Sequence, residues 1–257
     1  MNGVDEHPAS RVPALVLLGA TGSGKTPLGQ QIEARGLWEK RCLHFDFGAN
    51  LRAVVAGYSP HHQPKCPGHG TSDPAVTRRA SAAGGGGSTP FTVEEIDFLR
   101  SVLESGALLE DEHFPLAERI LRSFLAARGA DPEKTIVLNG LPRHVGQARA
   151  LQRIAEVRDV VLLDCTPETI LRRIETNVGG DRSDRADDAP AAVARKLALF
   201  TRRTAALVEH YRRAGVRVHA VHVTATMTPE QVWRILAEHH GGESGGETGD
   251  SLSTTGE

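Results

Sequence analysis

Short runs of apolar residues alternate along the chain with longer segments in which apolar residues recur at helical spacing. The short runs are dense in Val, Leu, Ile and Phe without strict polar alternation, which is typical of strands buried on both faces of a parallel sheet. Five runs qualify: Ala14–Leu18, Cys42–Phe47, Thr135–Leu138, Val160–Asp164 and Val216–Val223. Because helical segments lie between them, the pattern predicts an α/β fold of three layers, with helices on both faces of a parallel sheet.

Helix starts are indicated by hydroxyl residues at three places. Thr92 followed by Glu95, and Thr228 followed by Gln231, have the spacing of a capping box, in which each side chain bonds the backbone of the other residue. Thr166 precedes a proline, a residue that favours the first helical position. We therefore expect helices to begin directly after these three threonines.

Two segments lack an apolar period. Residues 58–90 are rich in Gly, Pro, Ser and His, and residues 241–257 contain four acidic residues and no basic one. Such segments cannot bury enough apolar surface to offset the entropy lost on ordering, so we expect both to be disordered. With a flexible N-terminus over residues 1–12, this leaves one domain over residues 13–240.

Composition restricts the partners. The formal net charge is −2 and aromatic residues are 4% of the chain, so no broad basic surface with interleaved aromatics is indicated. Three cysteines do not form a disulfide framework, the N-terminal residues do not resemble a signal peptide, and no run is long enough to span a bilayer. We expect a cytoplasmic monomer with small-molecule partners, which binds neither nucleic acid nor membranes.

A phosphate-binding loop is the clearest motif. The segment GATGSGKT follows the first apolar run and opens a helical segment, as the pattern GxxxxGK[ST] requires. Glycines let backbone N–H groups point at phosphate oxygens, the lysine supplies a movable charge for the β- and γ-phosphates, and the threonine hydroxyl can hold a metal ion. The predicted ATP-binding residues are Gly19, Gly22, Ser23, Gly24, Lys25 and Thr26, with Lys25 also catalytic and Thr26 a ligand of Mg²⁺.

Five further motifs follow the phosphate-binding loop along the chain. The segments read LVLLGATGSGKTPLG, FGANLRAVV, GALLEDEHF, LNGLPRHVGQA, VLLDCTPETILRRI and DRADDAPAAVARKLALFTRRTAALVEHYR. Over most of residues 13–223 they resemble the motifs of the adenylate kinase family of nucleoside monophosphate kinases. The resemblance implies a P-loop kinase fold with strand order 2-3-1-4-5, a part that binds the nucleoside monophosphate (NMP) over about residues 48–112, and a short lid over about residues 177–189. It also implies Mg²⁺-dependent transfer of the γ-phosphoryl group of ATP to a nucleoside monophosphate, with AMP as the expected acceptor.

The resemblance assigns three residues to the acceptor. Arg52 and Arg143 match the two arginines that hold the acceptor phosphate, and Gln147 matches the glutamine that reads the edge of adenine. A guanidinium group suits this task because its fixed fork of donors meets several phosphate oxygens at once. The simpler alternative for each arginine is an ordinary surface position.

The lid would supply further cations. Arg185 lies in a segment that resembles the family's R-x-D-D motif, Arg182 is the candidate for an additional lid arginine, and Lys196 or Arg195 falls where the following helix sends a cation toward the transferred group. A cation of this kind is worth about 10³ to 10⁵ in the rate of phosphoryl transfer. The alternative is a solvated run of charges. The short lid contains no cysteine, so we expect no zinc there.

The chain departs from the family at two carboxylates. Ala49 and Asn139 stand where the resemblance predicts aspartates that orient the water ligands of Mg²⁺. Asp46 could substitute for them, or it could be no more than a polar strand end. Two alternatives to a nucleotide kinase therefore stay open: a catalytically weakened nucleotide-binding or sensing protein, and a P-loop kinase for another small-molecule acceptor. The sequence disfavours an ATPase that depends on nucleic acid.

Overall fold

The computed structural model of this protein describes residues 11–57, 91–107, 109–180 and 190–238. The segments expected to be disordered, residues 58–90 and 241–257, lie outside these ranges, as does most of the expected lid. Side chains at the start of the helix that follows the lid are also outside the description. The domain boundaries within the chain therefore stay predictions.

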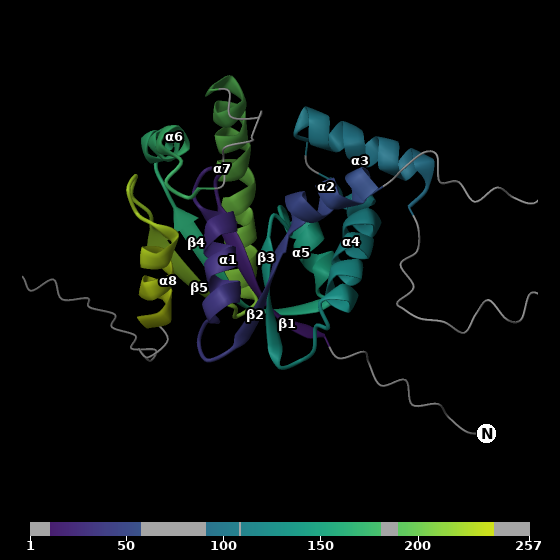
Figure 1. Ribbon diagram of the computed structural model, residues 1–257, viewed down its shortest axis with the longest axis horizontal. Helices are drawn as coiled ribbons and strands as arrows, with labels where there is room; N and C mark the ends of the chain where they lie inside the picture. The colour runs from purple at the N-terminus through teal and green to yellow at the C-terminus, as the bar shows by residue number, and fades with distance from the viewer. Residues whose placement is uncertain (1–10, 58–90, 108, 181–189, 239–257) are drawn as a thin grey trace, which may run out of the picture.

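A parallel sheet of five strands forms the centre of the molecule (Figure 1). The strand order β2-β3-β1-β4-β5 confirms the order that the resemblance implies. Each predicted apolar run overlaps a strand, although β4 begins earlier, Val216 and Val223 lie just outside β5, and Phe47 starts a helix instead of ending β2. The strands are β1 (Val12–Gly19), β2 (Arg41–Asp46), β3 (Lys134–Asn139), β4 (Ala155–Asp164) and β5 (Arg217–His222).

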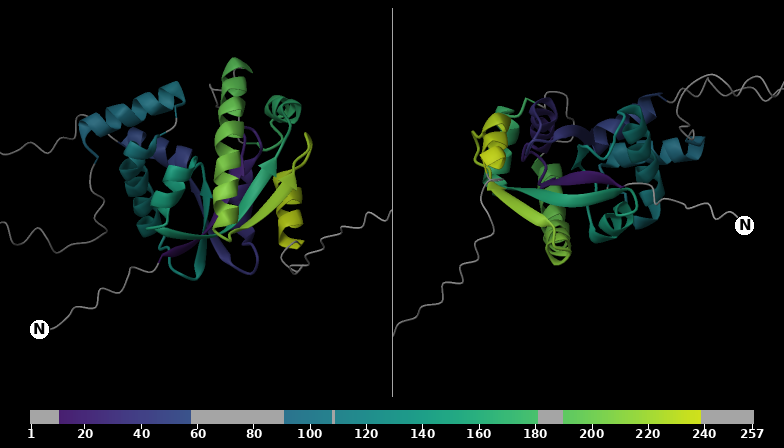
Figure 2. Two further views of the ribbon diagram at one scale, coloured as in Figure 1. Left: turned by 180° about the vertical axis from the view of Figure 1, so that it is seen from behind. Right: turned by 90° about the horizontal axis from the view of Figure 1, so that it is seen from below.

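Helices cover both faces of the sheet, as the view from below shows (Figure 2). Alternate residues of β1 point to opposite sides: Val16 packs in the cluster with α4, α5 and α7, whereas Leu17 packs with α1 and α8. The three predicted layers are thus confirmed. The helices in the described residues are α1 (Lys25–Arg35), α2 (Phe47–Gly57), α3 (Val93–Ser105), α4 (Phe114–Ala127), α5 (Val145–Leu151), α6 (Pro167–Thr176), α7 (Pro190–Arg213) and α8 (Pro229–Glu238).

The predicted caps form as expected. The Glu95 amide donates to the Thr92 hydroxyl over 3.2 Å, and the Thr92 amide donates to the Glu95 carboxylate over 2.9 Å. Thr228 and Gln231 make the same pair of contacts before α8, and the hydroxyl of Thr166 caps α6. Local side-chain chemistry therefore determines where these helices begin. No helix in the described ranges combines the length and the apolar character needed to cross a membrane.

Two leucines test the packing of the sheet. Leu138 on β3 is fully buried, whereas Leu171 on α6 is 42% exposed. We expect Leu138→Ala to lower the free energy of unfolding by about 2 to 5 kcal/mol, because it leaves a cavity in the core. The matched variant Leu171→Ala should change it by no more than about 0.5 kcal/mol. Urea unfolding measures both, and equal losses would contradict this description of the core.

Candidate active site

The phosphate loop joins the end of β1 to the start of α1. Gly22 and Gly24 have φ angles of +81° and +98°, which strain any residue with a side chain. A Cβ atom at Gly19 would lie 2.5 Å from the hydroxyl oxygen of Ser23. The Ser23 side chain is buried, and its hydroxyl has no hydrogen-bond partner within the described chain. The loop thus has the curled backbone and the spare donor that an anion requires.

Lys25 lies over this loop. Its ammonium group donates to the carbonyl oxygens of Gly19 and Ala20, each over 2.7 Å. These contacts hold the charge beside the loop at the N-terminus of α1, where the helix dipole favours anions. The structure therefore brings together all six residues that the motif assigned to ATP.

A polar triangle lies next to the loop, where three segments meet. The Thr26 hydroxyl donates to Oδ2 of Asp46 over 2.7 Å, and the Asn139 amide nitrogen lies 2.9 Å from the hydroxyl and 3.0 Å from the same carboxylate oxygen. Asp46 and Asn139 are register partners in the β2–β3 ladder. Because the strands are parallel, their carboxyl ends share one edge of the sheet with the phosphate loop.

Asp46 is held in its charged form. Burial alone would raise the pKa of this carboxyl. The backbone amide of Ala49 donates to Oδ1 over 2.9 Å, the Thr26 hydroxyl donates to Oδ2, and electrostatic interactions with His44 and Arg52 lower the pKa of Asp46 further. The net effect is a pKa below the ordinary value for aspartate. The triangle therefore presents a carboxylate, and not a carboxylic acid, at neutral pH.

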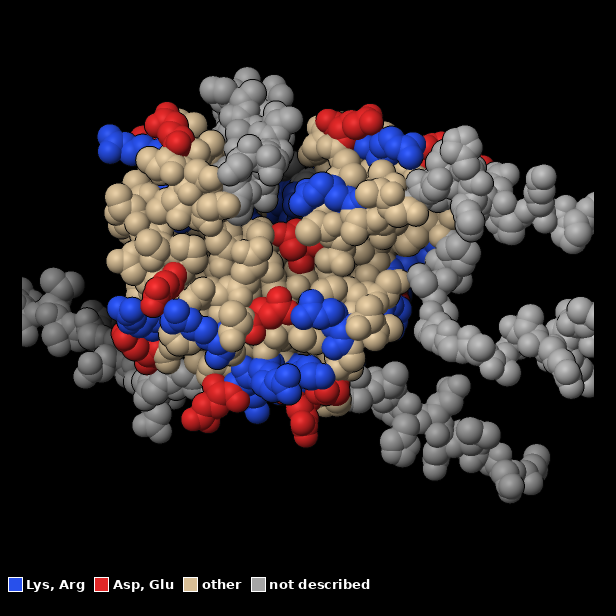
Figure 3. Space-filling view, in the orientation of Figure 1, with Lys and Arg blue, Asp and Glu red and all other residues tan. Residues whose placement is uncertain are grey.

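One cavity of about 310 Å³ connects the phosphate loop to α2 and to the loop that follows β3. Arg52 on α2 and Arg143, which follows β3, both line it. Basic side chains gather at the hollow in the upper centre of Figure 3. The charged residues among the described lining are Lys25, Arg52, Arg143, Arg203 and Asp46. Four cations and one carboxylate make this a site for a polyanion.

Gln147 is also at the cavity, but its amide is already engaged. The side chain is buried, its nitrogen donates to the carbonyl of Leu109 over 2.7 Å, and its oxygen accepts from the backbone amide of Arg143 over 2.8 Å. These two bonds tie the residues before α4 to the loop after β3. Its expected role in reading a base stays a prediction, and that role would require an exchange of partners.

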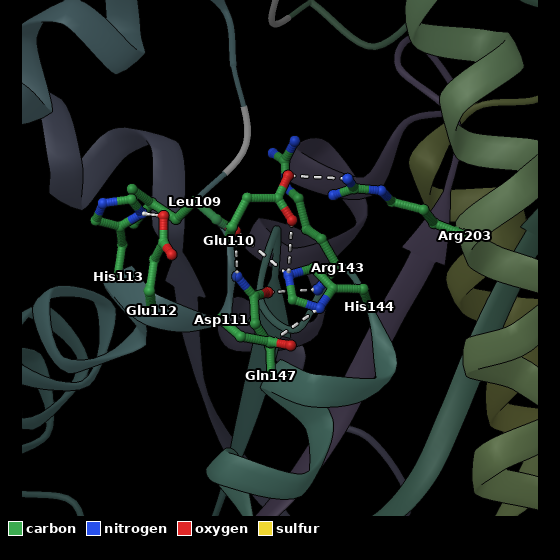
Figure 4. Close-up of polar contacts among 9 residues, drawn as sticks. All are labelled: Leu109, Glu110, Asp111, Glu112, His113, Arg143, His144, Gln147 and Arg203. Atoms are coloured by element: carbon green, nitrogen blue, oxygen red, sulfur yellow. Dashed lines mark hydrogen bonds and ion pairs between the residues drawn. The ribbon is translucent and has the colours of Figure 1, made fainter.

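Arg203 is a cavity residue that the sequence reasoning missed. It projects from α7 toward Glu110, and the two side chains pair over 2.9 Å (Figure 4). Its Nη1 atom is buried and has no hydrogen-bond partner within the described chain. A signal was present, because Arg203 lies three residues after Phe200 and four before Leu207, on the face of α7 that turns to the cavity.

Glu110 connects Arg203 to a histidine that directly precedes α5. The hydrogen bond from Arg203, with smaller contributions from nearby charges that include His144, lowers the pKa of Glu110 below its ordinary value. His144 lies 4.0 Å from Glu110 and 3.1 Å from the carboxylate of Asp111 (Figure 4). The segment before α4 is therefore held from α7 on one side and from the residues before α5 on the other.

The side chains of the predicted lid cations lie outside the part of the chain that the structure describes. Arg182 and Arg185 lie outside the described residues. Lys196 and Arg195 belong to α7, but their side chains are outside the description. Their proposed contacts with the transferred group stay predictions.

Comparison with known proteins identifies the family. No model of a known protein family matches the chain. However, an adenylate kinase from Stenotrophomonas maltophilia (strain K279a) is 33% identical over 209 residues, which cover 78% of this chain and 86% of that protein. The chain belongs to the adenylate kinase family.

Other adenylate kinases match shorter parts. A protein of Thermus thermophilus is 30% identical over 145 residues, or 54% of this chain and 70% of the relative. The adenylate kinase of Sinorhizobium medicae is 34% identical over 127 residues, which cover 45% of this chain. This match spans 62% of that relative, which is less than two thirds of its length. Within the adenylate kinase family, this member has an alanine and an amide at positions 49 and 139, where the resemblance predicts carboxylates.

The Arg203–Glu110 pair can be tested by titration. Arg203→Met removes the main cause of the lowered pKa of Glu110, so we expect that pKa to rise toward 4.5. In the wild type, the stabilisation from this pair should be present at neutral pH and should be lost as the pH falls through the lowered native pKa. NMR titration of the Glu110 carboxyl carbon measures the shift.

Arg213→Met is the matched control, because Arg213 also lies on α7 but pairs with Glu209. It should leave the titration of Glu110 unchanged. The same midpoint for Glu110 in the wild type and in Arg203→Met would show that the pair does not form in solution.

Proposed function

We propose that this protein is a nucleoside monophosphate kinase that transfers the γ-phosphoryl group of Mg²⁺-bound ATP to an acceptor monophosphate, with AMP preferred. The observation that supports the proposal is the continuous cavity, which has the phosphate loop at one end and Arg52 and Arg143 at the other. A hydrolase needs only the first end, whereas a transferase between two phosphate esters needs both.

The donor would bind at the loop. Its β- and γ-phosphate oxygens would take hydrogen bonds from the loop amides and from Ser23, and Lys25 would exchange its two carbonyl partners for phosphate oxygens. The Thr26 hydroxyl, beside the Asp46 carboxylate, offers the oxygen donors that Mg²⁺ prefers. When bound, the ion would neutralise charge between the β- and γ-phosphates.

The acceptor would need no general base. Its phosphate is already an anion, so an oxygen of that phosphate can attack the γ-phosphorus of ATP while the bond from the γ-phosphorus to the β,γ-bridging oxygen breaks and ADP leaves. Arg52 and Arg143 would hold this oxygen in line and reduce the repulsion between the two anions. The preference for adenine depends on Gln147, whose amide would leave Leu109 to meet the base.

The lid would complete the site. Arg182, Arg185 and Lys196 are proposed to cover the transferred group, stabilise its developing charge and exclude water. Exclusion of water matters because a phosphate loop with bound ATP can otherwise support hydrolysis when the acceptor is absent.

The activity can be tested with a panel of acceptors. We expect diphosphate formation from Mg·ATP with AMP, and less with GMP, CMP, UMP or dTMP. Lys25→Ala should reduce turnover at least about 10³-fold, because it removes the cation nearest the phosphates. Lys40→Ala, an exposed lysine outside the cavity, is the matched control and should retain full turnover.

The panel also distinguishes the alternatives. ATP binding without turnover of any monophosphate would contradict the proposal and favour a nucleotide-sensing protein. The absence of carboxylates at positions 49 and 139 is the observation that raises this alternative. Turnover with a monophosphate other than AMP would support the proposed kinase activity and contradict the proposed preference for adenine.

Arg143 provides a test of the acceptor end alone. Arg143→Met should raise the KM for the acceptor about 10- to 100-fold, the cost of losing charge-assisted hydrogen bonds to a phosphate, with little change in the KM for ATP. Arg149→Met, on the exposed side of α5, is the matched control. Steady-state kinetics with each substrate varied in turn measures the split, and equal changes in both KM values would refute this assignment.

A further inference from the structure

The polar triangle beside the phosphate loop contains Asn139, one of the two residues that stand where the resemblance predicts a carboxylate. Positions 49 and 139 are occupied by an alanine and an asparagine, yet the cavity does not lack an acidic group. Asp46 is the only acidic residue among the described residues that line it, and it shares this lining with four basic residues. A single carboxylate in this position has a defined partner, the hydroxyl of Thr26, at 2.7 Å.

The geometry of Asn139 depends on Asp46. The amide nitrogen of Asn139 lies 3.0 Å from Oδ2 of Asp46, and an aspartate side chain has nearly the same shape as asparagine. An aspartate at position 139 would therefore place a second carboxylate oxygen about 3 Å from the first, where the two cannot both ionise at low cost. The amide donates a hydrogen bond to the carboxylate instead. Asp46 and Asn139 are thus compatible with each other, whereas two aspartates would compete.

The position of Thr26 then indicates what Asp46 acts on. The Thr26 hydroxyl donates its proton to Asp46 and accepts a hydrogen bond from Asn139, which leaves its second oxygen lone pair to present to a cation. A divalent cation that takes Thr26 as a ligand would therefore lie close to the Asp46 carboxylate. Oxygen donors of this kind suit Mg²⁺, which keeps several waters that nearby carboxylates can orient.

We propose that Asp46 is the positioning carboxylate for the divalent cation of the nucleotide, that Asn139 orients it, and that the replacements at positions 49 and 139 accompany this relocation. The inference rests on the proposed function, because it assumes a nucleoside triphosphate whose cation binds at Thr26. It concerns the donor end alone, so it does not depend on the identity of the acceptor.

A purely structural role for Asp46 must be separated from this one. Oδ1 of Asp46 accepts from the backbone amide of Ala49 at the start of α2, as an N-cap does. Asparagine and serine are also good N-cap residues, so Asp46→Asn and Asp46→Ser retain a cap for α2 and remove the charge. If one of the two variants fails to fold, the other still tests the charge.

The experiment measures metal binding and not turnover. Mn²⁺, a paramagnetic replacement for Mg²⁺, is titrated into the protein–ATP complex, and EPR measures the concentration of free Mn²⁺. We expect both variants to bind Mn²⁺ about 10- to 100-fold more weakly than the wild type. Calorimetry in EDTA should give the same affinity for metal-free ATP within a few-fold. Asp97→Asn, an exposed residue on α3 outside the cavity, is the matched control and should bind Mn²⁺ like the wild type.

Transfer of the charge supplies a second readout. In the double variant Asp46→Asn with Asn139→Asp, the carboxylate and the amide exchange places within the same triangle, so we expect Mn²⁺ affinity to recover most of the loss. Wild-type Mn²⁺ affinity in both single variants, or no recovery in the double variant, would overturn the proposal. Absence of monophosphate turnover in the wild type would contradict the proposed function instead, and would leave the Mn²⁺ comparison intact.

Discussion

The parallel register of β1, β2 and β3 is the constraint on which the site depends. Because the strands run in one direction, each ends at the same edge of the sheet, and each delivers a different group there. β1 delivers the phosphate loop, β2 delivers Asp46, and β3 delivers Asn139 and then Arg143. A slip of one residue in the β2–β3 ladder would turn the side chain of Asp46 to the opposite face and separate it from Thr26. The buried layers on both faces oppose such a slip, so core packing holds the polar triangle in place.

Among the described residues that line the cavity, four are basic and one is acidic, and this excess of positive charge favours anions. A triphosphate and a monophosphate bound together, as the proposed function requires, would repel one another, and the cations along the lining would reduce that repulsion. A lone carboxylate among them would weaken anion binding unless it had a positive partner of its own. The hydrogen bonds from Ala49 and Thr26 hold it in place, and a bound cation would supply that partner. On the opposite side, Glu110 limits the free charge of Arg203 without entering the described lining.

Much of the fold could be predicted from the sequence because local signals were strong. The apolar runs located every strand, and the hydroxyl caps at Thr92, Thr166 and Thr228 located the starts of three helices. The phosphate loop was predictable because its glycines satisfy a backbone requirement that does not depend on distant contacts. Arg203 was missed because its role arises only when α7 packs beside the segment before α4, 93 positions away in sequence. The internal bonds of Gln147 were missed for the same reason.

The contacts of Lys25 have a consequence for the thermodynamics of ligand entry. Since its ammonium group is already ordered against two carbonyl oxygens, the phosphate that we propose to bind there would replace one set of hydrogen bonds with another. Little side-chain entropy remains to be lost at this residue, because the conformational restriction belongs to the fold itself. The enthalpy gained at Lys25 would therefore be only the difference between its hydrogen bonds to phosphate oxygens and its hydrogen bonds to the two carbonyl oxygens. Selectivity for the proposed ligand at this end of the cavity would therefore come from the charge of the incoming oxygen, since a neutral oxygen would offer the lysine nothing better than the carbonyl oxygens it already holds.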